Sequence, residues 1–134
     1  MYNEVKAHIQ EMLDLGAIRP SNSPWASAIV LVRKKDGRLR ICIDLRRLNN
    51  RTVKDAYSLP KIESILDSLL GAKIFSTLDL KAGYWQVEMA EECKAYTAFT
   101  CGPLGFYECD TMPFGATNTP VSYTHLTLST IYSV

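Results

Sequence analysis

The chain has 134 residues, of which 47% are hydrophobic and 22% are charged. This length supports one domain with a modest core, and the composition is ordinary for a globular protein. No apolar run approaches the roughly 20 residues of a membrane-spanning helix, and the N-terminus lacks the basic and apolar regions of a signal peptide. We therefore expect an intracellular protein, neither secreted nor membrane-bound.

Charge is distributed unevenly, although the net charge is only +1. Residues 19–61 carry 11 Lys or Arg against 3 Asp or Glu, whereas residues 62–134 carry 3 against 8. A basic block beside an acidic one suits a phosphate-rich ligand on one side and metal-binding carboxylates on the other. Taken alone, the composition favours a solvated charged surface.

The cysteines form no C-x-x-C pair, which argues against a zinc site. Nothing in the composition indicates the secreted context that a disulfide framework needs. Reduced thiols are therefore expected at all four positions, which are Cys42, Cys93, Cys101 and Cys109.

The chain begins with a predicted amphipathic helix over residues 3–15, in which apolar residues recur at helical spacing. Gly16 stands where a C-terminal cap belongs. Residues 19–24 contain two prolines and predict a loop.

A β-hairpin is predicted next. Residues 26–33 are apolar and β-branched, and residues 39–44 alternate apolar with polar side chains, as a half-buried strand does. The Asp-Gly pair within residues 35–38 supplies the positive φ that a tight turn requires.

A second helix is predicted from Pro60 to Gly71, after an irregular polar stretch over residues 45–58. Five apolar residues at helical spacing are expected on its buried side: Ile62, Ile65, Leu66, Leu69 and Leu70.

The remaining elements are short. We expect strands over residues 74–80 and 85–89 with a turn between them, and a hairpin formed by residues 96–101 and 106–112. Residues 112–115 then predict a loop that leads into a helix. Helices mixed with antiparallel hairpins indicate the α+β class, an antiparallel sheet with packed helices.

One segment, residues 75–86, combines an apolar strand, the carboxylate of Asp79, a small-residue turn and two aromatic residues. A carboxylate at a strand end is held rigidly while its oxygens face solvent, and Mg²⁺ prefers such ligands. A strand-ending Asp can equally cap the turn that follows. For an isolated Leu-Asp-Leu, turn capping is the better interpretation.

The surroundings change this balance, because the segment resembles the first catalytic-aspartate motif of reverse transcriptases from Ty3/gypsy-type retrotransposons. Further stretches match this family in the same order, together spanning residues 3–120. They read Ser23-Pro24-Trp25-Ala26-Ser27, Val32-Arg33-Lys34-Lys35-Asp36-Gly37, Arg40-Ile41-Cys42-Ile43-Asp44-Leu45-Arg46-Arg47-Leu48-Asn49, Thr97-Ala98-Phe99, Gly105-Phe106-Tyr107-Glu108 and Met112-Pro113-Phe114-Gly115-Ala116-Thr117-Asn118-Thr119-Pro120.

The resemblance implies the fold of a right-hand polymerase, with fingers over residues 1–73 and the start of the palm over 74–120. It also implies an RNA-directed DNA polymerase from a retrotransposon polyprotein that also carries RNase H. Such an enzyme acts in a cytoplasmic particle or the nucleus. Its partners would be a primed RNA or DNA template and deoxynucleoside triphosphates, and two Mg²⁺ ions would promote in-line phosphoryl transfer.

Individual roles follow from the same resemblance. Asp79 would be the catalytic metal ligand, and the Leu80 carbonyl would complete the metal shell. Lys34 and Arg40 would hold the incoming triphosphate, since Arg offers a planar fork and Lys a mobile point charge. Without the family pattern, these residues would simply be solvated.

Aromatic residues are implied beside the incoming sugar. Tyr84 would collide with a ribose 2′-hydroxyl and so admit deoxyribose, and Phe114 would sit beside the same sugar. Trp25, Pro113 and Gly115 would lie near the template or primer. For these aromatic side chains, burial in the core is the alternative.

A different role is expected for part of the Arg-x-x-x-Asp-x-Arg-x-Leu-Asn block. We expect Asp44, Arg46 and Asn49 to brace the junction of fingers and palm through hydrogen bonds.

Two departures from the family pattern bear on activity. No adjacent Asp-Asp pair occurs in the 134 residues, so the second metal motif of the family is missing and the chain is expected to be inactive alone. Residues 121–134 are rich in Ser and Thr and are predicted to be a divergent tail, foreign to the family. Two alternatives remain: a non-catalytic nucleic-acid-binding remnant and an unstable pseudogene product.

Overall fold

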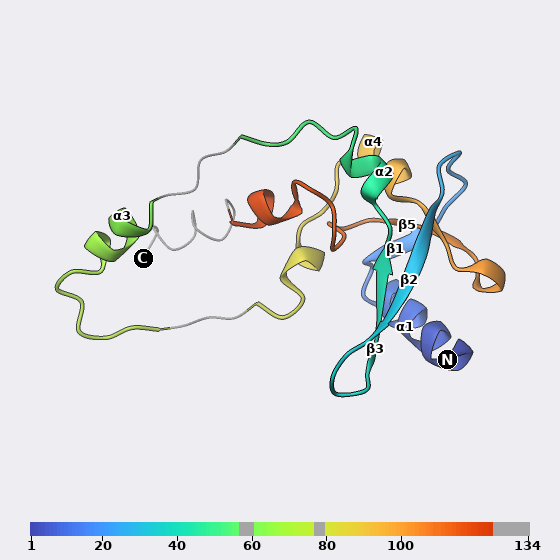
Figure 1. The fold of residues 1–134 in the computed structure, drawn as a ribbon, viewed down its shortest axis with the longest axis horizontal. Coiled ribbons are helices and arrows are strands. Elements are labelled where there is room, and N and C mark those ends of the chain that lie inside the picture. Colours follow the sequence, from blue (N-terminus) through green and yellow to red (C-terminus); the bar gives the residue numbers. More distant parts are fainter. Residues whose placement is uncertain (57–60, 77–79, 125–134) are drawn as a thin grey trace.

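The computed structural model describes residues 1–56, 61–76 and 80–124, and in Figure 1 most elements surround one sheet. Its strands are β1 (Ile18–Pro20), β2 (Ser27–Arg33), β3 (Leu39–Ile43), β4 (Phe99–Thr100) and β5 (Phe106–Cys109). They lie in the order β1-β5-β4-β2-β3. Neighbours are antiparallel except β2 and β4, which form a short parallel pair. The predicted α+β class and both predicted hairpins are confirmed, with shorter strands in the second.

Helix α1 (Tyr2–Asp14) packs on the sheet through Val5, Ile9 and Met12. The spacing of these three residues places them on one face of a helix. The helix ends as predicted: Gly16 takes a φ of +66°, which favours glycine because it has no side chain. The core that α1 covers also contains Ala17, Ile18, Phe99, Cys101 and Cys109.

The remaining helices are short: α2 (Arg46–Asn49), α3 (Ile62–Ser68), α4 (Glu91–Lys94) and three 3₁₀ turns, η1 (Gly83–Gln86), η2 (Ala95–Thr97) and η3 (Gly102–Leu104). Residues 119–124 are helical as well, which bears out the helix predicted after the 112–115 loop. Within the described residues no helix is long and apolar enough to cross a membrane.

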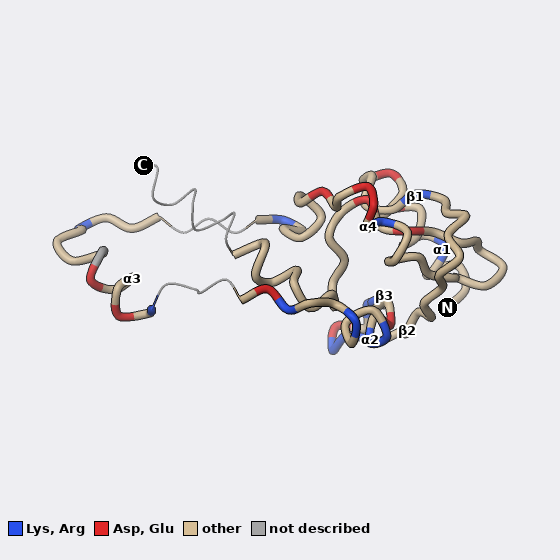
Figure 2. Tube along the Cα trace, turned by 90° about the horizontal axis from the view of Figure 1, so that it is seen from above, with Lys and Arg blue, Asp and Glu red and all other residues tan. Residues whose placement is uncertain are grey.

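The second predicted helix forms as α3, but its predicted buried side is wrong. Figures 1 and 2 both show α3 well away from the sheet. Accordingly, four of the five apolar residues expected to be buried are exposed: Ile62, Leu66, Leu69 and Leu70. An amphipathic pattern shows which face of a helix is apolar but not what covers it.

Of the two other predicted strands, the one over 74–80 is wrong in the described residues. The one over 85–89 is borne out only at its end, where Glu88 forms an antiparallel bridge with Thr111. Residues 74–76 are irregular and exposed, while residues 77–79 lie outside the described part. Tyr84 and Trp85 belong to η1, which follows Ala82 at a φ of +51°. Successive side chains of a strand point to opposite faces, whereas both of these rings contact Phe114. The 3₁₀ turn therefore allows both rings to contact Phe114, which a strand would not.

Two other stretches expected to be irregular carry elements. Arg46–Asn49 forms α2, and Ile18–Pro20 forms β1 at the edge of the sheet, where proline is tolerated. The partner of β1 is β5, about 90 residues further along the chain. Such a distant partner leaves no local signal in the sequence.

A charged network secures β1 to α4 and β5. The Nε of Arg19 donates to Glu108 at 2.8 Å, and its guanidinium also pairs with Glu91. The ammonium of Lys94, which is buried, lies 2.8 Å from Glu91 and 2.9 Å from Asp110. Because the cations face carboxylates, little of their charge is available to an outside ligand.

Phe99 provides a test of the core, because its side chain is completely buried. We expect Phe99→Ala to lower the free energy of unfolding by about 3–5 kcal/mol through lost burial and a residual cavity. The control Phe75→Ala removes the same ring from a site that is 63% exposed and should change stability by less than about 0.5 kcal/mol. Urea unfolding followed by circular dichroism measures both, and equal losses would contradict this assignment of the core.

The charged network predicts a loss of stability in acid. Hydrogen bonds from Arg19 and Lys94 lower the pKa of Glu91 from 4.5 to about 2. Because the folded-state pKa is depressed, this contribution is complete above pH 4.5 and is lost as the pH falls toward 2. Unfolding midpoints measured between pH 7 and pH 2.5 should fall less steeply for Glu91→Gln than for the wild type; parallel curves would be the opposite result.

Candidate functional site

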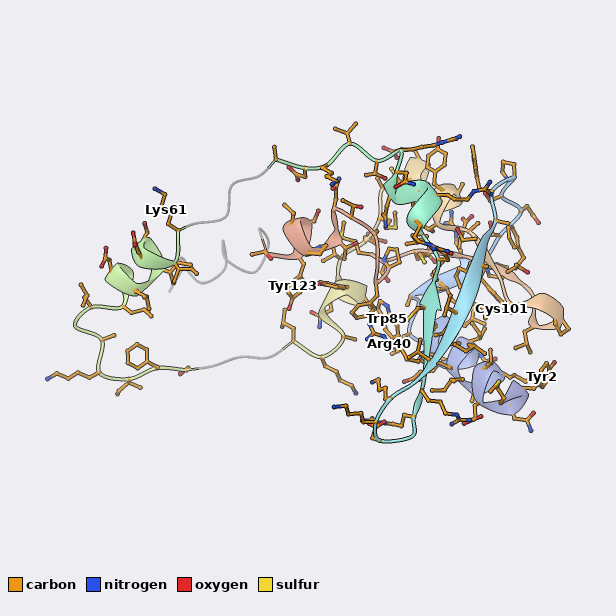
Figure 3. All side chains as sticks on the ribbon, viewed as in Figure 1. Tyr2, Arg40, Lys61, Trp85, Cys101 and Tyr123 are labelled. Carbon is orange, nitrogen blue, oxygen red and sulfur yellow. The ribbon has the colours of Figure 1, made fainter. Side chains whose placement is uncertain are left out.

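Aromatic side chains from three parts of the chain meet beside β3. The ring of Phe114 lies 4.8 Å from that of Tyr84 and 6.3 Å from that of Trp85, measured between centroids. Tyr84 in turn meets Tyr123 edge-on at 5.1 Å. In Figure 3 the labelled Trp85 and Tyr123 both lie near the 83–86 turn. We call Tyr84, Trp85, Phe114 and Tyr123 the aromatic cluster.

Arg40 extends the aromatic cluster with a positive charge. Its guanidinium carbon lies 5.5 Å from the centroid of Phe114, within the range of a cation–π contact. The side chain is exposed, and no carboxylate among the described residues pairs with it. Its charge therefore remains available to an anion, in contrast to that of Arg19 in the network.

Lys34 lies on the same side of the hairpin as Arg40. Val32 is paired with Arg40 in the β2–β3 register, and Lys34 follows Val32 by two residues. Side chains two residues apart share a face of an extended strand. Figure 2 shows Lys and Arg gathered around β2, β3 and α2, whereas acidic residues gather near α4. The separation of charge seen in the sequence thus persists in space.

The loop that carries Phe114 is held on both sides. Pro113 is buried, and its carbonyl accepts a hydrogen bond from the Thr119 hydroxyl at 3.1 Å. Gly115 adopts a φ of +97°, a conformation that favours glycine. The Asn49 amide donates to the Gly115 carbonyl at 2.8 Å. The predicted bracing role of Asn49 is therefore confirmed.

Asp44 and Arg46 behave differently from Asn49. Their side chains form a two-point ion pair with each other, at 2.6 and 2.8 Å, and this pair lowers the pKa of Asp44 to about 2. Within the part of the chain that the structure describes, these two side chains pair with each other and not across the junction, so the predicted bracing by Asp44 and Arg46 is not found there.

Asp79 lies outside the described residues, so its role as metal ligand stays a prediction. Leu80 is described; its side chain is 43% exposed and its backbone is irregular. Among the described residues no three His, Cys, Asp or Glu side chains come close enough to hold a metal ion. These described residues do not by themselves make a magnesium site.

Trp25 makes its ring contact outside the aromatic cluster, with Tyr96 at 5.9 Å. Each of these two rings is 47% exposed. The backbone N–H of Trp25 donates to Ser23, whose hydroxyl donates to the Ala95 carbonyl at 2.6 Å. Trp25 is thus held beside η2, with part of its face open to solvent, and its proximity to a template stays a prediction.

Sequence reasoning missed two members of the aromatic cluster, Trp85 and Tyr123. Trp85 falls in a predicted strand, and Tyr123 falls in the predicted divergent tail. The feature of the sequence that relates to Tyr123 is the glycine at position 83. A Cβ at Gly83 would lie 2.6 Å from the Tyr123 ring, so a larger residue there would collide with it. The glycine thus makes room for an aromatic ring 40 positions later in the chain.

The family described as "Reverse transcriptase (RNA-dependent DNA polymerase)" matches residues 32–132, a range that includes most of the predicted tail. The chain is 41% identical over 121 residues to the enzymatic polyprotein of cauliflower mosaic virus (strain Strasbourg), covering 87% of this chain and 18% of the relative. It is 42% identical over 125 residues to the retrovirus-related Pol polyprotein from transposon 297 of Drosophila melanogaster, covering 90% and 12%. The boundary at residue 120 stays a prediction.

Solved structures agree with these relatives. A prototype foamy virus protease–reverse transcriptase superposes with a TM-score of 0.82 at 27% identity, covering 98% of this chain and 18% of that one. A foamy viral protease–reverse transcriptase in complex with double-stranded DNA gives 0.82 at 25% identity, covering 98% and 23%.

The relatives confirm the predicted retrotransposon-type reverse transcriptase. They include viral polyproteins at similar identity, so the narrower Ty3/gypsy class stays a prediction. The chain spans less than a fifth of the length of these relatives. It belongs to the reverse transcriptase family and represents the fingers and part of the palm of that domain.

Proposed function

We propose that this chain is the nucleotide-receiving part of an RNA-directed DNA polymerase. The observation that carries the proposal is the position of Phe114, whose ring contacts both Arg40 and Tyr84. These three residues come from β3, the 83–86 turn and the 112–115 loop. A guanidinium that pairs with no carboxylate of the described residues, and that lies beside aromatic rings, suits a ligand that joins phosphates to a sugar and a base.

In this proposal each residue has a separate task. Arg40 and Lys34 bind the triphosphate of a deoxynucleoside triphosphate. Tyr84 and Phe114 line the sugar, and Tyr84 opposes a 2′-hydroxyl. Trp25, Pro113 and Gly115 lie near a primed RNA or DNA template. Support for a nucleic-acid partner comes from the related foamy viral enzyme, which was solved with double-stranded DNA.

Magnesium belongs to the same proposal. Asp79 and the Leu80 carbonyl are the groups in this chain that would hold Mg²⁺, since carboxylate and carbonyl oxygens are its preferred ligands. When bound, the ion would neutralise charge on the phosphates. Because the 134 residues contain no adjacent Asp pair, we expect the chain by itself to lack polymerase activity.

Primer extension tests the catalytic assignment. With Mg²⁺, deoxynucleoside triphosphates and a primed template, the 134-residue chain should give no extension above background, because a two-metal site needs further carboxylates. If extension does occur, Asp79→Asn should abolish it and Asp67→Asn, which alters a carboxylate of α3, should not. Robust extension that survives Asp79→Asn would overturn the assignment of the metal ligand.

A second candidate function is nucleic-acid binding without catalysis, favoured by the Lys and Arg gathered around β2, β3 and α2 (Figure 2). Binding of a primed duplex should weaken with salt, since it releases counterions from phosphates. Replacing Lys34, Lys35 and Arg40 by Glu should reduce the slope of log affinity against log salt by about 1 for each phosphate that no longer meets a cation. Fluorescence anisotropy measures the slopes.

The control variant reverses the charge of Lys6 on α1 and of Lys73 beyond α3, which both lie outside the β2–β3 hairpin. For this variant, the slope of log affinity against log salt should equal that of the wild type. An unchanged slope in the Lys34, Lys35 and Arg40 variant would exclude the hairpin as the binding surface.

A further inference from the structure

Asn49, at the end of α2, binds the backbone of the Phe114 loop through both atoms of its amide. Its Nδ2 donates to the Gly115 carbonyl at 2.8 Å, and its Oδ1 accepts from the Thr117 N–H at 2.9 Å. A side-chain amide in this arrangement pairs with the loop as a neighbouring backbone would. Each bond also fixes the amide orientation that the other bond requires.

Asn118, in the same loop, makes the reverse connection. Its Nδ2 donates to the Val53 carbonyl at 3.0 Å, and its Oδ1 accepts from the Asp55 N–H at 3.1 Å. Helix α2 and the segment that follows it are therefore joined to the loop before the last helix by four hydrogen bonds, two from each asparagine. Asn118, however, holds the 53–55 segment, whereas Asn49 holds the peptides next to Phe114.

The position of Phe114 depends on this support more than on burial. Its side chain is 42% exposed, so the surrounding core does not by itself fix the ring. Gly115 follows it with a φ of +97°, and the Gly115 side of the loop lies against β3, since a Cβ there would be 3.9 Å from the Ile43 carbonyl. A flexible glycine needs an outside contact to keep one conformation, and Asn49 supplies that contact.

We infer that Asn49 is a positioning residue of the nucleotide site, because it holds the Phe114 ring against Arg40 and Tyr84. That Phe114 belongs to a nucleotide site rests on the proposed function. That Asn49 holds the loop next to Phe114 rests only on the hydrogen bonds described above. Aspartate is the decisive replacement: it has the shape of asparagine but places a carboxylate oxygen against the Gly115 carbonyl. The donor is lost and two oxygens repel.

The test uses ¹⁹F NMR of the 134-residue chain labelled with 4-fluorophenylalanine. The chain has four phenylalanines. Phe114→Leu identifies the resonance of Phe114, and Phe99→Leu identifies that of Phe99, which reports on the core because Phe99 is completely buried. Asn49→Asp is compared with Asn118→Asp and with Asn50→Asp. Asn50 is exposed, and its side chain forms no hydrogen bond within the described residues, so it controls for the added charge.

Asn49→Asp should shift the Phe114 resonance toward that of free 4-fluorophenylalanine and leave the Phe99 resonance in place. Asn50→Asp and Asn118→Asp should leave both resonances in place. An unchanged Phe114 resonance in Asn49→Asp, or an equal shift in Asn118→Asp, would refute the inference. If Asn49→Asp also moves Phe99, Asn49→Ala removes both bonds without a charge; movement of Phe99 there too would refute the inference, since Asn49 would then support the whole fold.

A nucleotide titration separates this inference from the proposed function. Adding dTTP with Mg²⁺ to the wild-type chain should move the Phe114 resonance, and Asn49→Asp should need more dTTP for half of that shift. No response in the wild type would count against the proposed nucleotide site. The comparison of variants without nucleotide would still decide the role of Asn49.

Discussion

Packing of α1 against the sheet, centred on the buried ring of Phe99, is the constraint on which the other parts depend. The strands are short: β4 has two residues and β1 has three. Ladders of this length gain little stability from their own hydrogen bonds, so the apolar layer beneath them must hold them together. Once α1 covers the sheet, β3 becomes a fixed edge, and the loop with Phe114 lies beside that edge.

The candidate site is built at this edge from one residue of the sheet and two residues outside it. Phe114 is carried by a loop, Tyr84 by a 3₁₀ turn and Arg40 by the edge strand itself. The loop in turn depends on Asn49 and on a glycine with positive φ.

The molecule has two charged regions, and they differ in whether their cations are paired with carboxylates. Near α4, Arg19 and Lys94 are neutralised by Glu91, Glu108 and Asp110, so this part contributes to stability. Along the β2–β3 hairpin, Lys34 and Arg40 face no carboxylate at ion-pair distance among the described residues. A cation without a partner is the kind that can exchange its water for a phosphate. The hairpin is therefore the side of the molecule that we assign to the ligand.

Local chemistry explains which elements the sequence by itself determined. Helix α1, the β2–β3 hairpin with Gly37 and the β4–β5 hairpin all follow from the spacing of apolar residues and from glycines at turns. Each is formed by residues close together in the chain. The family and the candidate residues around Arg40, Tyr84 and Phe114 were likewise predictable, because their motifs are contiguous.

Only the tertiary structure decided the features that depend on distant partners. The pairing of β1 with β5, the exposure of α3 and the tight turn at Tyr84 and Trp85 all depend on what lies opposite them in space. The contact of Tyr123 with Tyr84 and the hydrogen bond from Asn49 to the Gly115 carbonyl also depend on distant partners. Hydrophobic spacing indicates which face of an element is apolar, but the packing of the whole chain determines what lies against that face.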